Sequence, residues 1–303
     1  MTDRILDLSE SAARLSVRDG LLVVAREGQD PATIPLADVG VLVVSHPQVS
    51  YTHAVLAGLV AQGGAFVTCD ERHLPVGMLL PVDAHYVQTE RFALQARASV
   101  PTRKRLWRQI VRAKVRAQGN LLAELHGEDQ GLCALALETR SGDSSNVEAQ
   151  TSRRYWPALF ADDAWRRNRE AEDQNRFLNY GYAVLRAIVA RAICAAGLHP
   201  SLGLHHHNRY NSFCLADDLM EPLRPTVDRA VYHLVKAEGP DAPLVPRTKA
   251  ALLQAVTARL GLQGQERSVF DVASIMASSL VAVLEKREKH LILPEFSRAP
   301  KGP

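Results

Sequence analysis

Short apolar runs separated by Gly, Pro and Asp follow one another along the first ninety residues, a pattern typical of a mostly-β region. The predicted strands cover residues 13–17, 20–25, 39–44, 65–68 and 77–80. One segment has a different period. Between Val49 and Gln62 apolar residues recur at helical spacing, and Gly63 and Gly64 follow as a stop signal. We therefore expect one helix among the strands.

Helical periodicity dominates from Glu90 onward. Pro101 and Thr102 suit a first helical turn, and apolar positions then recur three and four residues apart. Residues 175–198 are mostly apolar and end at Gly197, which predicts a long buried helix. A further helix is expected to begin near Leu215. Its apolar stripe consists of Leu215, Leu219, Leu223 and Val227.

These patterns predict an α+β fold, with a small N-terminal mostly-β domain followed by a larger all-helical domain. We place the β domain at residues 1–90, the helical domain at 91–290 and a C-terminal tail at 291–303. Of the 303 residues, 47% are hydrophobic and 23% are charged, so a core of ordinary size can form. This composition excludes disorder as the main state, and the length favours two domains.

Targeting and redox signals point to a cytoplasmic protein that has no membrane partner. No uncharged apolar run approaches the length of a spanning helix, and acidic residues occupy the start, where a signal peptide would be basic. The four cysteines lie far apart without a CxxC pair, which argues against a disulfide framework or a thiolate zinc site. We interpret them as core thiols.

The net charge of +3 hides an uneven distribution. Residues 1–90 hold five Lys or Arg against eleven Asp or Glu, so the rest of the chain carries +9. Between Arg91 and Arg116 there are nine basic residues and no acidic one. The second part of the chain is therefore expected to meet a polyanion, while the acidic first part favours packing against a protein partner or a second copy.

Basic residues repeat around the apolar stripe of the helix that follows Pro101. Such a face is either simply solvated or binds phosphates, and the missing acids favour nucleic acid because ordinary surface helices mix both signs. A second Arg-rich stretch is interleaved with Tyr155, Trp156 and Trp165, which suits a phosphate backbone and unstacked bases. The candidate DNA-binding residues are Arg103, Lys104, Arg105, Arg108, Arg112, Arg116, Arg153, Arg154, Arg166 and Arg167.

An isolated acidic residue, Glu148, follows a predicted loop at residues 142–146. Asp143, Ser144 or Ser145 could cap the next helix, which places Glu148 in or near its first turn. A carboxylate there favourably meets the helix dipole, so Glu148 alone does not indicate chemistry.

Three consecutive histidines, residues 205–207, precede a helix that carries Asp217, Asp218 and Glu221 on the side opposite its apolar stripe. The simplest interpretation is a solvated acidic face. Two carboxylates one turn apart beside an imidazole also suit a divalent cation, Mg²⁺ or Mn²⁺. Pro222 cannot return a hydrogen bond to Asp218, so we expect a first turn or a kink there.

Three separated blocks carry a resemblance to a known family. SSNVEAQTSRRYW, NYGYAVLRA and GLHPSLGLHHHNRYNSFCLADDLMEPLRP occur in this order. Together they resemble the CRISPR-associated integrase/endonuclease of spacer acquisition, in the branch found beside the single-protein RNA-guided nuclease (type II). The resemblance covers nearly the whole chain and implies an N-terminal β domain followed by a helical catalytic domain.

The resemblance also implies site residues. The family's metal-binding Glu, His and carboxylate correspond here to Glu148, His206 and Glu221. Asp218 matches a neighbouring acidic position and is taken as a further metal ligand, while Tyr180 matches a tyrosine near the active site. Because His206 has a histidine on each side, His205 or His207 could share the ligand role.

The activity implied is Mg²⁺- or Mn²⁺-dependent phosphoryl transfer, in which a 3′-hydroxyl of a short DNA fragment attacks a phosphodiester of the CRISPR repeat. Cleavage of branched DNA is the same chemistry with water or another hydroxyl. The implied partners are double-stranded and branched DNA, a second copy bound through the β domain and a small second adaptation protein; the RNA-guided effector nuclease stays open. Two alternatives remain: a non-catalytic DNA-bridging module and a metallohydrolase of a small phosphoester.

Overall fold

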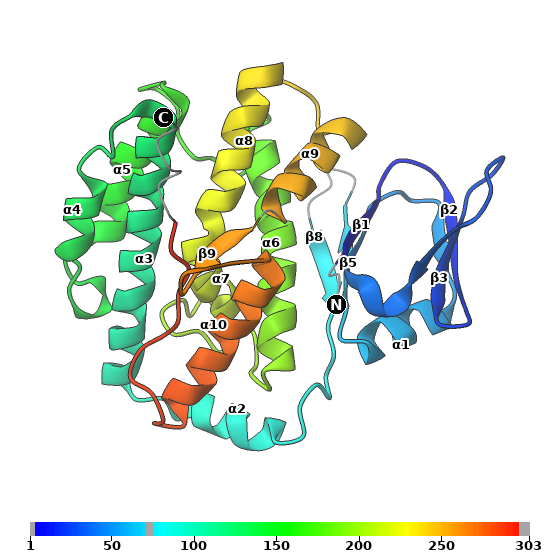
Figure 1. Cartoon of the computed structure of the whole chain (residues 1–303), viewed down its shortest axis with the longest axis horizontal. Coiled ribbons are helices and arrows are strands. Elements are labelled where there is room, and N and C mark those ends of the chain that lie inside the picture. The colour runs from blue at the N-terminus through cyan, green and yellow to red at the C-terminus, as the bar shows by residue number, and fades with distance from the viewer. Residues whose placement is uncertain (1–3, 71–74, 258, 297–303) are drawn as a thin grey trace.

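The computed structural model describes residues 4–70, 75–257 and 259–296 and has a strand-rich region beside a larger helical region (Figure 1). The first sheet has the order β1-β5-β7-β8, in which only β8 is antiparallel to its neighbour. Its strands are β1 (Arg4–Leu8), β5 (Val39–Val44), β7 (Ala65–Cys69) and β8 (Pro75–Leu79). The second sheet consists, in order, of β4 (Ala32–Pro35), β3 (Leu21–Ala25), β2 (Ala13–Arg18) and β6 (Val49–Tyr51).

The predicted α+β class is confirmed, and each of the five predicted strands lies within two residues of an observed one. The prediction of a single helix over residues 49–62 is wrong at its start. Val49–Tyr51 pairs with β2 as the parallel strand β6, and α1 (His53–Ala61) begins only after Thr52. Helical spacing extends through this segment, but the edge of the second sheet supplies backbone partners that spacing does not reveal.

β5 is buried on both faces, as a central parallel strand requires. Leu42 and Val44 belong to a core shared with the second sheet and α1, whereas Val41 and Val43 belong to the core of the helical region. Because alternate residues of a strand point to opposite faces, this one sheet separates and joins the two cores. The strand-rich and helical regions therefore share a sheet rather than meeting only at a surface.

The rest of the described chain consists of helices and the loops that connect them, with one small hairpin near its end. They are α2 (Gln88–Ala96), α3 (Val100–His126), α4 (Leu132–Leu137), η2 (Ser141–Asp143), α5 (Val147–Phe160), α6 (Asn175–Ala195), α7 (Cys214–Met220), η3 (Glu221–Leu223), α8 (Arg224–Glu238), α9 (Pro246–Val256) and α10 (Val269–Leu284). The hairpin is β9 (Leu260–Leu262) with β10 (Gln265–Arg267).

The predicted core helix is confirmed as α6, which runs through the centre of the helical region (Figure 1). A Cβ on Gly181 would lie 2.5 Å from Val227 Cγ1, so the glycine allows α6 and α8 to approach closely. Among the described residues, α6 alone has the length and hydropathy of a membrane-spanning helix, and 78% of its most apolar window is buried within the protein.

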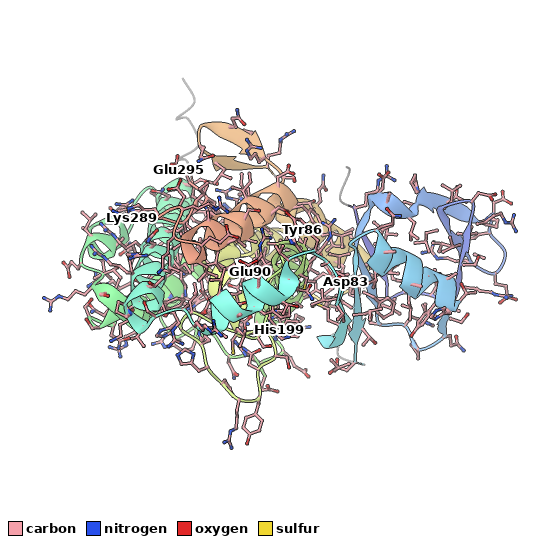
Figure 2. The ribbon with its side chains drawn as sticks, turned by 90° about the horizontal axis from the view of Figure 1, so that it is seen from below. Asp83, Tyr86, Glu90, His199, Lys289 and Glu295 are labelled. Carbon is pink, nitrogen blue, oxygen red and sulfur yellow. The ribbon has the colours of Figure 1, made fainter. Side chains whose placement is uncertain are left out.

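α2 crosses beneath the helical region, and the connection that carries Asp83 and Tyr86 leads to it from β8 (Figure 2). Gln95 on α2 is buried and donates from Nε2 to the carbonyls of His199 and Leu202, both at 2.9 Å. The side-chain oxygen of Gln95, Oε1, also accepts from the backbone N–H of His199 at 2.9 Å. α2 thereby fixes the backbone that leads into the three histidines.

Residues 291–296, here called the C-terminal strap, lie along α3. The Leu291 N–H donates to Gln109 Oε1 at 2.9 Å, and Asn120 Nδ2 donates to the Phe296 carbonyl at 2.6 Å. The predicted tail is thus packed over its first six residues, while residues 297–303 lie outside the described residues.

Candidate active site and nucleic-acid interface

Glu148 lies in the first turn of α5, as predicted. The Asp143 carboxylate accepts the backbone N–H groups of Val147 at 2.9 Å and Glu148 at 3.0 Å, so Asp143 caps the helix. The Glu148 side chain is therefore not needed for capping. It points instead to Lys114 of α3, whose ammonium lies 2.7 Å from Glu148 Oε1.

The same ammonium reaches Glu221, with Lys114 Nζ 2.6 Å from Glu221 Oε2. Glu221 opens the turn η3, where Pro222 produces the local break in the helix that the sequence predicted. Its other oxygen, Oε1, accepts from Arg224 Nε at 2.8 Å. Two carboxylates 73 positions apart thus meet at one cation from a third helix.

Charge dominates the behaviour of this buried group. Burial alone would raise the pKa of Glu221, but Arg224 and Lys114 outweigh it, so its pKa is lowered to about 2. Burial would lower the pKa of Lys114, but Glu221 and Glu148 outweigh it and raise that pKa. Both groups are therefore charged at neutral pH.

His206 lies beside these carboxylates and is held by Asp218. Its Nδ1 is 2.6 Å from Asp218 Oδ1, and this hydrogen bond is the main reason why the pKa of His206 is raised. With the Nδ1 proton directed to the carboxylate, Nε2 remains the ring nitrogen that can bind a ligand. The charges of Glu221 and Glu148 raise the pKa of His206 further, so both carboxylates act electrostatically on this ring.

Asp218 holds the backbone of the histidine segment as well as the ring. Its Oδ2 accepts the N–H groups of Leu204 at 2.6 Å and His205 at 2.9 Å, and its Oδ1 accepts that of His206 at 3.3 Å. The segment passes so closely that a Cβ on Gly203 would collide with the His206 carbonyl oxygen. A glycine at position 203 is therefore a steric requirement of this turn.

His205 and His207 have other surroundings. The His205 ring is stacked on Trp107 of α3, with ring centroids 4.2 Å apart and planes inclined by 1°. His207 is exposed and has its ring centroid 6.4 Å from that of His205. His206, with a carboxylate behind its ring, is the histidine best prepared to bind a ligand.

The simplest interpretation of the acidic helix is wrong, because all three carboxylates are buried rather than solvated. Asp217 pairs with Arg186 at 2.7 Å, and Asp218 is fully buried with four N–H donors at its two oxygens. A carboxylate with this many donors has little capacity left for a cation. In this arrangement Asp218 holds His206, and its expected role as a metal ligand stays a prediction.

Whether the site suits a divalent cation depends on Glu148, His206 and Glu221. In the part of the chain that the structure describes, no three His, Cys, Asp or Glu side chains could hold one metal ion as they stand. The Lys114 ammonium occupies the space between the two carboxylates. The donor types nevertheless fit: two carboxylates and one imidazole, with Glu221 Oε2 buried and lacking an aligned hydrogen-bond donor.

Tyr180 has its hydrogen-bond partner in the strand-rich region, and its expected place near the active site stays a prediction. Its hydroxyl donates to Asp7 of β1, on the side of α6 that faces the sheet. Tyr182 lies on the other side of α6 and donates to the fully buried Asp228 of α8, which also accepts from Tyr155 at 2.7 Å. Burial raises the pKa of Asp228 to about 6.

Lys114, Arg224 and Asp228 were not predicted from the sequence as site residues. A signal for Lys114 was available, since it occupies a buried position between Val111 and Val115 on the apolar side of α3. A charged residue within an apolar stripe requires a partner of opposite charge. The Arg224 guanidinium carbon lies 4.5 Å from the ring centroid of Tyr182, whose hydroxyl donates to Asp228. Because Arg224 also donates to Glu221, it connects Asp228 and its tyrosine partner to Glu221.

The basic residues predicted to surround the apolar stripe of α3 lie at the protein surface. Lys114, which is also on α3, is buried. Lys104, Arg105, Arg108 and Arg116 are exposed, and Arg112 is partly exposed. The pKa of Arg112 is lowered by burial and then by the like charges of Arg108 and Arg116, which indicates a locally uncompensated positive potential. Such a potential attracts a polyanion.

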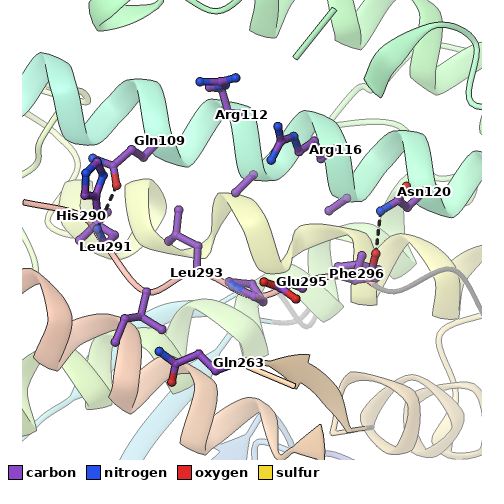
Figure 3. A pocket seen from close by; sticks show the side chains of 14 residues that line it. Gln109, Arg112, Arg116, Asn120, Gln263, His290, Leu291, Leu293, Glu295 and Phe296 are labelled. Carbon is purple, nitrogen blue, oxygen red and sulfur yellow. Dashed lines mark hydrogen bonds between the residues drawn. The ribbon is translucent and has the colours of Figure 1, made fainter. Parts of the chain in front are cut away.

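A groove of about 560 Å³ runs between α3 and the C-terminal strap. Gln109, Arg112, Arg116 and Asn120 follow one another along the helix at its edge, and the strap passes beside them (Figure 3). The buried Nε of Arg112 and the buried Nε2 of Gln109 have no hydrogen-bond acceptor. Arg112 and Arg116 line the groove together with the Glu295 carboxylate, so its charge is mixed.

Part of the second Arg-rich stretch is used inside the protein. Arg167 donates to the side-chain oxygens of Asn175 at 2.7 Å and Asn179 at 2.6 Å, and Arg166 donates to two backbone carbonyls. Tyr155 and Trp165 are buried and pack against other aromatic rings, so the expectation that they stack on bases is wrong. Arg153 and Arg154 are exposed and remain available for DNA contacts. Arg103 lies on α3 and is partly exposed.

Known proteins share both the sequence and the fold. The family model for CRISPR associated protein Cas1 matches residues 6–243. The CRISPR-associated endonuclease Cas1 of Neisseria meningitidis is 38% identical over 300 residues, covering 98% of this chain and 97% of that protein. The structure of a casposase bound to integration product has a TM-score of 0.79 at 18% identity, covering 99% of this chain and 94% of that one.

A Cas6-RT-Cas1–Cas2 complex contains a similar chain, with a TM-score of 0.76 at 15% identity, covering 98% of this chain and 37% of that one. The sequence match, together with the shared fold, places the chain among the CRISPR-associated endonucleases and integrases. The chain belongs to the Cas1 family of adaptation endonucleases and integrases, as the three sequence blocks predicted.

Proposed function

We propose that this protein is a metal-dependent DNA integrase that inserts short DNA fragments into a CRISPR repeat by transesterification. The observation that carries the proposal is that Glu148 and Glu221 both contact the Lys114 ammonium. The ring of His206, oriented by Asp218, carries charge interactions with both glutamates. The similarity to a casposase bound to integration product supports strand joining over cleavage alone. Cleavage of branched DNA would use the same groups with water or another hydroxyl as nucleophile.

Glu148, Glu221 and Nε2 of His206 would hold Mg²⁺ or Mn²⁺. When bound, such an ion makes a hydroxyl a better nucleophile and neutralises charge on the phosphate oxygens. Asp218 fixes the ring of His206 and the backbone around it. Arg224 holds Glu221 from behind, so the two carboxylates and the imidazole are oriented before DNA arrives.

The basic face of α3, together with Arg153 and Arg154, would bind the phosphates of double-stranded and branched DNA. We further propose a homodimer formed through the strand-rich region, and assembly with a small second adaptation protein. The similarity to a chain of a Cas1–Cas2 complex supports the second partner. The effector nuclease, the domain limits at residues 90 and 290, and the cytoplasmic location stay predictions from the sequence.

A half-site joining assay tests the proposal. The purified protein, its small partner and Mn²⁺ are incubated with a short duplex and a supercoiled plasmid that carries the repeat, and joined product is measured. We expect His206→Ala to abolish joining while leaving DNA binding nearly intact. Full joining by this variant, or by Glu148→Ala, would refute the site and favour a non-catalytic DNA-bridging module.

Salt dependence separates DNA from a small phosphoester as the substrate. If about six to ten phosphates are neutralised, affinity for duplex DNA falls by ~10³ to 10⁵ between 50 and 200 mM salt. A small-phosphoester hydrolase has no reason to show such a dependence. Affinity that does not change with salt would therefore contradict the proposed DNA-binding surface.

A further inference from the structure

Lys114 has an unusual position for a lysine. Its side chain is 11% exposed and lies on the buried side of α3, with Nζ 2.7 Å from Glu148 Oε1 and 2.6 Å from Glu221 Oε2. Burying an ammonium is costly unless it is paired, and here two carboxylates pair it. The ammonium therefore forms an ion pair with each of the two carboxylates.

The free oxygens of the site are limited. Glu221 Oε1 is committed to Arg224 Nε at 2.8 Å, which leaves Oε2 as the oxygen that Glu221 can offer a metal. A magnesium ion binds oxygen at about 2.0–2.1 Å, shorter than the ammonium contact at the same atom. Within the space between the two carboxylates, a metal ion and the ammonium would repel each other strongly, so both cannot occupy it.

We propose that Lys114 is the built-in occupant of the metal site: its ammonium holds Glu148 and Glu221 together in the metal-free protein, and a divalent cation must displace it to bind. The inference rests on the proposed function, which assigns these two carboxylates as metal ligands. It explains why the donors are gathered although no three metal-ligating side chains in the described residues could hold a metal as they stand. Lys114 thus prevents mutual repulsion of the carboxylates and also competes with the metal.

Lysine labelling of the wild-type protein tests the displacement without a variant. The protein is treated with an amine-acetylating reagent with and without Mn²⁺, and acetylation is quantified for each lysine by mass spectrometry. Because Lys114 is buried between its partners, we expect little labelling without metal and a rise of about fivefold or more at saturating Mn²⁺. Exposed Lys236 on α8 serves as the internal reference and should not change.

A variant tests the competition. Lys114→Met keeps the length and apolar stem of the side chain but removes the ammonium. We expect its metal-free form to melt at a lower temperature than wild type, and Mn²⁺ to raise its melting temperature by more. In calorimetric titration, Lys114→Met should bind Mn²⁺ about tenfold or more tightly than wild type. Lys236→Met, which removes an exposed lysine, is the matched control.

The outcomes separate this inference from the proposed function. If wild type binds Mn²⁺ but Lys114→Met binds it no more tightly, or if Mn²⁺ leaves Lys114 labelling unchanged, the displacement is refuted and the metal site stands. If wild type and Lys114→Met both fail to bind Mn²⁺, the metal site itself is wrong, and the inference falls with it. Should Lys114→Met not fold, the labelling of wild type still decides.

Discussion

Replacing Asp218 by Asn tests whether this residue positions His206 or binds metal. In the wild-type protein the carboxylate is fully buried and accepts four N–H groups, two at each oxygen. Asn keeps one acceptor oxygen and replaces the other by an NH₂ group, which cannot accept. If the NH₂ group faces Leu204 and His205, both of their N–H groups lose their acceptor. If it faces His206, the imidazole can change tautomer and accept at Nδ1, so the backbone N–H of His206 is the donor that loses its acceptor.

The cost follows from this count. A buried donor left without an acceptor costs about 1–3 kcal/mol, so the loss is about 1–3 kcal/mol in one orientation of the amide and about 2–6 kcal/mol in the other. This is a large share of a typical stability of about 5–15 kcal/mol. The variant also loses the charged hydrogen bond that is the main reason why the pKa of His206 is raised, so that pKa should fall.

Urea unfolding of the variant, with exposed Asp241→Asn as control, measures the stability loss. Mn²⁺ titration of the folded protein should show affinity reduced by about 10–100-fold, the usual effect of removing a residue that orients a ligand. An unfolding midpoint equal to that of wild type would refute the four-donor role. Unchanged stability with complete loss of metal binding would instead restore Asp218 as a ligand.

Three further predictions concern the surroundings of the site. Because burial raises the pKa of Asp228 to about 6, above the ~3.9 of an unfolded chain, its ionisation reduces stability as pH rises from about 4 to 6. The unfolding free energy of wild type relative to Asp228→Asn should therefore fall by about 3 kcal/mol over that range, and a constant difference between the two proteins would contradict this. Arg108→Glu with Arg112→Glu should weaken DNA binding and flatten its salt dependence in a binding titration while Mn²⁺ affinity is unchanged; unaltered DNA binding would count against this face of α3. Arg167→Ala should lower the melting temperature, since Arg167 bonds two asparagines inside the protein, whereas exposed Arg153→Ala should not; equal melting temperatures would show the Arg167 contacts to be unimportant.

The sequence predicted those features that depend on local pattern. β5 was placed to the residue, the start of α3 within one or two residues, and the break at Pro222 with its reason. The stripe of residues 215, 219, 223 and 227 is buried as expected. Each of these depends only on neighbours within one turn or one strand.

What the sequence could not show depends on contacts between distant elements. Whether the acidic side of α7 meets water or protein is decided by α3 and α6, far away in the chain, and these supply Lys114 and Arg186. The resemblance placed Tyr180 near the site, but the tyrosine two positions later is the one on that side of α6. Two residues two positions apart on a helix point in directions about 200° apart. A shift of two positions along α6 therefore moves a side chain from the face toward the sheet to the opposite face.

One feature of β5 bears on how an assembly could measure length. Val41 and Val43 on one face and Leu42 and Val44 on the other anchor β5 in both hydrophobic cores, so moving the two regions relative to each other would disrupt close packing. If two copies pair through the strand-rich region, the gap between their reactive centres is set by solid protein. The distance between the two active sites would then stay constant when DNA binds, and disrupting the shared sheet would make it variable.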